Sequence, residues 1–143
     1  MPFYLRAALL SVISIGILSG CANKSGAYMG LTSATAPVLA ILSNDLFTGT
    51  AIGYMDRTGT IDIVSNVNPD LRCVGNFRYT GSKVGEGKMS CNDGNEAKFQ
   101  FNGLSMLSGY GFGTSTRGGV SFTFGLTPEE AKEYLKITKG KQL

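Results

Sequence analysis

The sequence has 143 residues, with 13 lysines and arginines, 10 acidic residues, no histidine and no tryptophan. Its formal net charge of +3 is spread along the chain, which gives no reason to expect a nucleic-acid partner. The absence of histidine excludes Ser-His-Asp and Cys-His catalytic arrangements and the usual zinc sites. A hydrophobic content of 43% with 20 glycines is typical of a turn-rich β protein and not of a disordered chain.

The chain begins with a pattern that is typical of exported proteins. Arg6 is followed by residues 7–18, AALLSVISIGIL, which carry no charge. This segment has the length of the apolar region of a signal peptide and is too short to cross a bilayer as a helix. We therefore predict a signal peptide over residues 1–20.

The boundary Leu18-Ser19-Gly20-Cys21 resembles the lipobox of bacterial lipoproteins. The resemblance implies that Cys21 becomes the first residue of the mature chain and carries acyl groups such as palmitate, which anchor it in a membrane. Ala22 stands where an aspartate typically retains such proteins in the inner membrane. The resemblance therefore implies the outer membrane, with the domain in the periplasm or at the cell surface.

The segment after Cys21 changes in character near residue 37. Residues 21–36 are small and polar, which predicts a lipidated flexible tether. Residues 37–143 are enough for a single β-rich domain with one core. The opening of that domain, residues 37–47, is apolar and could form a strand or a short helix.

Residues 52–64, 86–101 and 112–124 share one plan: a leading glycine, a polar turn with a second glycine, and a strand of alternating apolar residues. The leading glycines are Gly53, Gly87 and Gly113, and the turn glycines are Gly59, Gly94 and Gly119. Asp93-Gly94 favours a tight hairpin turn, because glycine tolerates positive φ. The pattern predicts a mainly β fold, an antiparallel β-hairpin meander that forms a small barrel or a curled sheet.

The rhythm of the second stretch, GEGKMSCNDG, resembles that of MORN-type repeats. The resemblance implies an array of successive β-hairpins, and the uneven spacing of the leading glycines limits it to architecture.

Cys73 and Cys91 form an even pair once Cys21 is assigned to lipidation, as expected in an oxidising compartment. Their midpoint, residue 82, lies in the turn-like stretch TGSKVGEG. A hairpin that turns there places the two cysteines opposite each other on neighbouring strands, so we predict a disulfide. The chain has no CxxC motif, and we expect no metal site and no cofactor.

The end of the domain carries the signals of a helix start. Thr127 suits an N-cap, Pro128 the first helical position, and Glu130 the carboxylate of a capping box. We predict one short helix from about residue 128 to 137, packed across an open end or an edge of the sheet.

No group of residues suggests catalysis. Asp56, Asp62, Asp93 and Glu96 lie in or beside expected turns, where acidic side chains serve backbone geometry. The stretch DRTGTID (56–62) lacks the acidic closing residue of a calcium loop. We therefore expect neither an enzyme nor a small-molecule substrate.

The resulting functional prediction is a non-catalytic binding or structural module that contacts an envelope protein or a cell-wall component. Its expected contact surface is the glycine-rich stretch 108–119. Tyr110, Phe112 and Arg117 in that stretch are residue types enriched in interfaces.

An alternative function comes from a second resemblance. SCNDGNEAKFQF (90–101) is similar to the opening Cys-x-Asp-Gly strand of membrane-bound inhibitors of C-type lysozyme, and SGYGF (108–112) to their inhibitory loop. This resemblance implies a periplasmic inhibitor that blocks a cell-wall hydrolase, with Ser108 and its neighbours in the enzyme's cleft.

Overall fold

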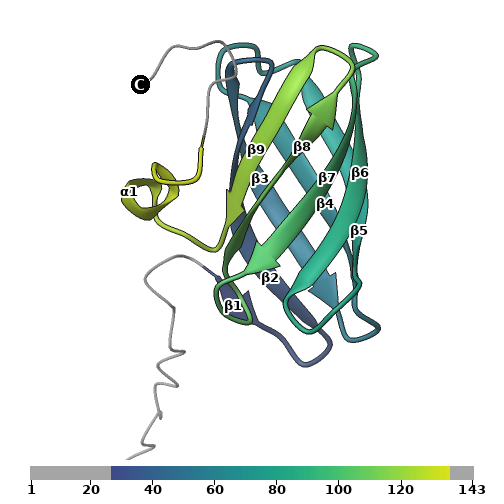
Figure 1. Ribbon diagram of the computed structural model, residues 1–143, viewed down its shortest axis with the longest axis vertical. Coiled ribbons are helices and arrows are strands. Elements are labelled where there is room, and N and C mark those ends of the chain that lie inside the picture. Colours follow the sequence, from purple (N-terminus) through teal and green to yellow (C-terminus); the bar gives the residue numbers. More distant parts are fainter. Residues whose placement is uncertain (1–26, 136–143) are drawn as a thin grey trace, which may run out of the picture.

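The computed structural model describes residues 27–135, which form a closed antiparallel barrel (Figure 1). The elements are β1 (Tyr28–Met29), β2 (Ser33–Leu42), β3 (Asp45–Tyr54), β4 (Thr58–Ser65), β5 (Arg72–Tyr79), β6 (Val84–Cys91), β7 (Glu96–Gly103), β8 (Gly109–Ser115), β9 (Gly118–Phe124) and α1 (Pro128–Ala131). Each strand pairs with the next, and β9 returns to pair with β2, which closes β2 to β9 into a barrel. The predicted mainly β meander is confirmed. The predicted signal peptide and Cys21 lie outside the described residues.

The folded domain begins earlier than the sequence predicted. β1 and the first residues of β2 fall within residues 21–36, so the prediction of a tether is wrong for 28–29 and 33–36. β1 pairs with β2 at Thr35 and Ala34, below the point where the β2–β9 ladder ends at Val38. Small, polar residues form strands here because β3 pairs with β2 over its full length.

The segment left open between strand and helix, residues 37–47, forms the rest of β2, a turn and the start of β3. Ser43 and Asn44 make the turn with positive φ angles of 50° and 66°. The inward residues Val38, Ala40 and Leu42 are all buried, which accounts for the apolar character of this stretch.

The barrel has two ends with different packing. The disulfide end carries the turns at residues 43–44, 66–71, 92–95 and 116–117, and the β1 end carries those at 30–32, 55–57, 80–83 and 104–108. Cys73 and Cys91 are in-register partners on β5 and β6 and form the predicted disulfide. Beside them, Ile63 and Leu42 are almost inaccessible, so the disulfide end is filled by a close-packed core.

The three predicted hairpins are present as β3–β4, β6–β7 and β8–β9. Gly94 lies in its turn with φ of 89°, as predicted. Gly59 and Gly119 lie within β4 and β9 instead, so their assignment to turns is wrong. The positive φ angles belong instead to Arg57, at 69° in the β3–β4 turn, and to Gly118, at 134° where β9 begins.

The strand glycines make room for aromatic rings inside the barrel. Phe77 is in register with Gly59 on one side and Gly87 on the other, and Phe101 with Gly85 and Gly111. A Cβ atom on any of Gly59, Gly85, Gly87, Gly109 or Gly111 would overlap a phenylalanine ring and a backbone carbonyl. An eight-stranded barrel is only just wide enough for its side chains, so each of these rings requires glycine on the strand that precedes it.

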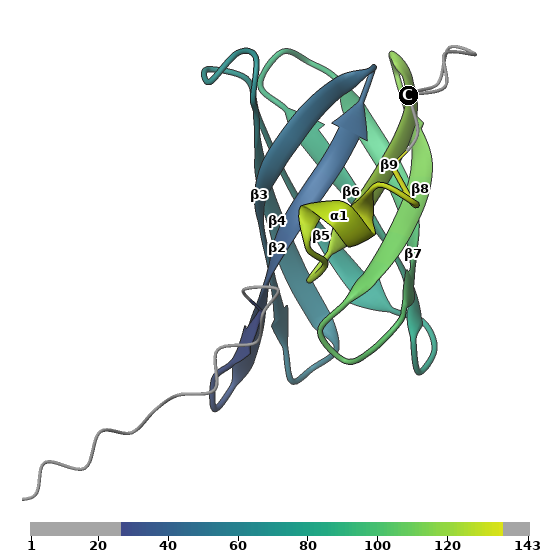
Figure 2. The ribbon, with the colours of Figure 1, turned by 90° about the vertical axis from the view of Figure 1, so that its left-hand side faces the viewer.

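The helix lies on the outer wall of the barrel, over β2 and β9 (Figure 2). Its capping box forms as predicted, since Glu130 N–H donates to Thr127 Oγ1 and Thr127 N–H donates to Glu130 Oε2. Helical geometry ends at Ala131, and turns continue to Tyr134, so the helix is shorter than predicted within the described residues. The predicted packing of the helix across an open end or an edge of the sheet is wrong. The sheet closes on itself, and the helix packs on its outer face instead.

Replacing Gly111 by alanine tests the pairing of rings with glycines. The new Cβ would overlap the Phe122 ring and the Gln100 carbonyl, so we expect Gly111→Ala to lower the free energy of unfolding by about 2 to 3 kcal/mol in urea titrations. Gly53→Ala is the matched control, because its Cβ would lie 4.0 Å from Phe77. Equal unfolding midpoints for the two variants would contradict the pairing.

Candidate functional site

An apolar cavity of about 60 Å³ lies inside the barrel toward its β1 end. Its lining comes from strands β2, β3, β4, β5, β7 and β9 and from the β7–β8 loop: Ala34, Ala36, Val38, Ala51, Gly53, Ile61, Phe77, Tyr79, Phe99, Phe101, Met106, Leu107, Phe122 and Phe124. Tyr79 supplies the one hydroxyl group among these described lining side chains. One buried water needs about 10 to 15 Å³. The space therefore corresponds to a few waters or a short apolar chain.

The cavity exists because small and large residues face each other across the barrel. Ala36 and Ala51, which are in register on β2 and β3, form a wall of small side chains. Phe77, Phe101 and Phe124 project from β5, β7 and β9. The small wall leaves unfilled the space that larger side chains would occupy.

The aromatic side of the cavity is a connected cluster of rings. Phe101 lies edge-on to Tyr79, Phe77 and Phe124, with ring centroids 5.0, 5.6 and 6.0 Å apart. Such edge-to-face pairs stabilise the arrangement beyond their buried area. The cluster therefore gives the cavity a defined shape, which suits binding of an apolar group.

The β7–β8 loop carries Met106 and Leu107 to the mouth of the cavity. The loop is held by its own hydrogen bonds, since the amides of Leu104 and Ser105 donate to the Ser108 carbonyl over 2.8 and 3.1 Å. The hydroxyls of Ser105 and Ser108 lie 2.6 Å apart. Met106 is 77% exposed although it also lines the cavity, so it stands at the boundary between cavity and exterior.

A cation stands beside the aromatic cluster. The Arg57 guanidinium lies 5.3 Å from the centroid of the Tyr79 ring and donates to the Gly81 carbonyl. Burial raises the pKa of the Tyr79 phenol above its ordinary value of 10.0, although the charge of Arg57 opposes this shift. Tyr79 is therefore neutral at physiological pH and does not offset the positive charge of Arg57.

The structure does not bring together the three residues predicted to bind a partner. Tyr110 stacks on Tyr134 at 4.5 Å and is half-buried. Phe112 is 55% exposed on the outer face of β8, beside Gln100 of β7. Arg117 lies in the β8–β9 turn at the disulfide end.

The two stretches that resemble lysozyme inhibitors also lie apart. The Asn92–Asn95 turn is at the disulfide end, whereas Ser108 lies in the β7–β8 loop at the β1 end. The two stretches therefore do not form one continuous surface.

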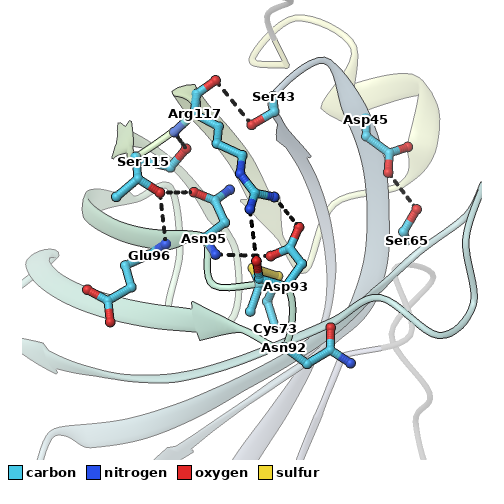
Figure 3. A network of polar contacts seen from close by, with 12 residues as sticks. Ser43, Asp45, Ser65, Cys73, Asn92, Asp93, Asn95, Glu96, Ser115 and Arg117 are labelled. Atoms are coloured by element: carbon cyan, nitrogen blue, oxygen red, sulfur yellow. Dashed lines mark hydrogen bonds and ion pairs between the residues drawn. A yellow bond between two sulfur atoms is a disulfide. The ribbon is translucent and has the colours of Figure 1, made fainter.

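Polar side chains at the disulfide end tie neighbouring turns together (Figure 3). Arg117 forms an ion pair with Asp93 and donates to the Asp93 carbonyl over 2.8 Å. Thr116 Oγ1 donates to Asn95 Oδ1 over 2.7 Å, and the Ser65 hydroxyl donates to Asp45 over 2.5 Å. These contacts join the β6–β7 turn to the β8–β9 turn and the start of β3 to the end of β4.

Three of the four acidic side chains singled out in the sequence have separate structural partners, and the fourth residue, Glu96, begins β7 with its amide donating to Thr116 Oγ1. Asp56 accepts from the Thr58 amide and hydroxyl at the β1 end, and Asp62 is ion-paired with Arg72 on the outer wall. Asp93 belongs to the network of turns at the opposite end. Within residues 27–135, no three His, Cys, Asp or Glu side chains gather into a potential metal site.

Comparisons with known proteins add no assignment, because the chain has no significant match to a family model, a curated protein or a solved structure. In the part of the chain that the structure describes, no helix has both the length and the hydropathy required to cross a bilayer.

Sequence reasoning missed the cavity. The alternation of Phe99, Phe101, Phe122 and Phe124 indicated inward-facing side chains. It did not indicate that alanines on β2 and β3 would face them. The available signal was the run of alternating small residues in ATAPVLA (34–40), which was assigned in part to a tether.

The Asp93 network predicts an acid-dependent loss of stability. A hydrogen bond from the Asn95 amide, with a further contribution from Arg117, holds the pKa of Asp93 below its ordinary value of 3.8. Such a carboxylate stabilises the fold above its unfolded pKa, and this stabilisation is lost as the pH falls through the folded pKa.

We therefore expect Asp93→Asn to lower the urea midpoint at neutral pH and the difference from the wild type to shrink below about pH 4. Urea titrations across the acid range measure this. Parallel midpoint curves for the two proteins down to the lowest pH would show that the Asp93 carboxylate has no such role.

Proposed function

We propose that this protein is a lipid-anchored, non-catalytic binding module of the bacterial outer membrane, and that it holds a small apolar group in the cavity at the β1 end of its barrel. The observation that carries the binding proposal is the cavity itself, open at one end and lined by aromatic rings and alanines. Closed eight-stranded barrels either fill their interior with side chains or hold one small ligand. This barrel is filled at the disulfide end and hollow at the other.

An apolar ligand follows from the chemistry of the lining. Water in this cavity would find few hydrogen-bond partners, so an apolar group gains by replacing it. No feature of the sequence indicated a small ligand, and the proposal of one rests on the cavity alone. Its small volume favours a short alkyl segment over a large ring system.

The anchor is supported by the lipobox-like residues Leu18 to Cys21 and the apolar stretch before them. The disulfide between Cys73 and Cys91 is consistent with an oxidising compartment outside the cytoplasm.

A series of straight-chain alcohols tests the cavity. We expect affinity, measured from chemical-shift titrations, to rise about fourfold per added methylene until the cavity is filled and then to level off. Ala51→Leu fills part of the cavity and should weaken binding by at least about tenfold.

Thr50→Leu is the matched control. Thr50 is the exposed neighbour of Ala51 on the same strand, so this substitution places a leucine side chain outside the barrel. Binding that is absent in the wild type, or equal in the two variants, would refute the cavity as the ligand site.

Intact mass of the protein extracted from cell membranes tests the anchor. We expect loss of residues 1–20, added acyl mass on Cys21, and a gain of two hydrogen atoms on reduction of the disulfide. The Cys21→Ser variant is the control and should lack the acyl mass. A full-length chain with three free thiols would contradict both the anchor and the compartment.

A further inference from the structure

Exposed apolar side chains gather at the β1 end of the barrel. Seven of the eleven large hydrophobic residues exposed in the described part of the chain lie there, and we call them the apolar rim: Met29, Leu31, Tyr54, Met55, Val84, Leu104 and Met106. Leu31, Met55 and Met106 are the most exposed, at 100%, 79% and 77%. Single exposed apolar residues need no explanation, but a group around one opening marks an interaction surface.

The rim comes from four connections that are far apart in the sequence. Met29 ends β1 and Leu31 lies in the turn after it. Tyr54 ends β3 and Met55 lies in the turn after it. Val84 begins β6, and Leu104 and Met106 lie in the β7–β8 loop. Met106 also lines the cavity, so the rim borders the cavity mouth.

Each of the four connections has at least one internal backbone hydrogen bond. The Gly30 amide donates to Ser33, Arg57 to Tyr54, Thr80 to Val84 and Leu104 to Ser108, over 2.7, 3.1, 2.9 and 2.8 Å. Unpaired backbone groups make entry into an apolar medium costly. Turns with internal hydrogen bonds avoid much of that cost, so they are suited to entering the boundary of a bilayer.

The charged residues in the turns at this end are two cations and one anion, a net charge of +1 that favours an anionic partner by a small margin. Arg57 and Lys83 lie in the β3–β4 and β5–β6 turns. The carboxylate of Asp56, in the same turn as Arg57, accepts two hydrogen bonds from Thr58. Apolar side chains bordered by cations are typical of surfaces that bind the interface of an anionic membrane.

The course of the chain places the same end next to the proposed anchor. β1 begins at Tyr28, and Cys21 precedes Ala27 by six residues. Six residues span at most about 20 Å when fully extended. Acyl chains on Cys21 would therefore hold the β1 end, and not the disulfide end, close to the bilayer.

We infer that the β1 end docks on a phospholipid surface, with the apolar rim inserted into the interface and the cavity mouth turned toward the lipid. The inference goes beyond the anchor, because the rim itself binds lipid whether or not Cys21 is acylated.

The test uses residues 22–143, which contain all the strands, the disulfide and the helix but cannot be acylated. Flotation with vesicles of phosphatidylethanolamine and phosphatidylglycerol measures binding. We expect the wild-type chain to float. Leu31→Ser, Met55→Ser and Met106→Ser combined should lower its partition coefficient by at least about tenfold. Vesicles of phosphatidylcholine alone should bind less, because they lack the negative charge.

The matched control combines Val67→Ser, Val74→Ser and Phe112→Ser, three exposed apolar residues outside the rim. This variant should bind within about twofold of the wild type. Both triple variants alter exposed side chains, and urea unfolding verifies that each remains folded.

The inference is overturned if the wild-type chain stays unbound or if both triple variants lose binding equally. Sedimentation that shows a dimer abolished by the rim substitutions, without vesicle binding, would assign the rim to a second copy instead. Because this chain carries no acyl group, failure here leaves the anchor intact, and missing acyl mass on Cys21 leaves the docking of the rim intact.

Discussion

The pairing of aromatic rings with glycines inside the barrel is the constraint on which the rest of the structure depends. A ring such as Phe101 fits only because Gly85, its neighbour in register on β6, has no side chain, and Phe122 depends in the same way on Gly111 of β8. The interior is therefore filled by large residues from alternate strands. On β2 and β3, small residues such as Ala36 and Ala51 stand where large side chains would be needed to fill the interior. The cavity lies against these small residues. The packing rule that closes the barrel thus also determines where it is hollow.

The two ends of the barrel consequently have different physical characters. At the disulfide end, Cys73 and Cys91 join two strands and the Asp93–Arg117 pair joins two turns over a core of buried hydrophobic residues. At the β1 end, the wall residues Phe77 and Tyr79 remain half-exposed and the connections carry apolar tips. Rigidity at one end holds the strands in register, so the other end remains open without losing its shape.

Local signals were sufficient to predict the hairpins, the disulfide and the capping box. The Asp93-Gly94 turn and the midpoint between Cys73 and Cys91 each determine a register over a few residues. Closure between β2 and β9 could not be predicted, because it pairs residues more than 75 positions apart, such as Leu42 and Val120. The apolar rim was hidden for the same reason. Leu31, Met55 and Met106 belong to separate turns, and only the barrel gathers them.

Three features meet at the β1 end: the entry of the chain from the proposed anchor, the cavity mouth and the apolar rim. Each has a separate physical origin, yet together they favour one orientation. Moving a short alkyl segment from a bilayer into water costs about 0.8 kcal/mol of free energy for each methylene that becomes exposed. A cavity whose mouth faces the lipid interface removes that barrier, because the segment passes from one apolar medium to another. On the proposed orientation the rim would provide an apolar path into the cavity, and acyl chains on Cys21 would keep that path short.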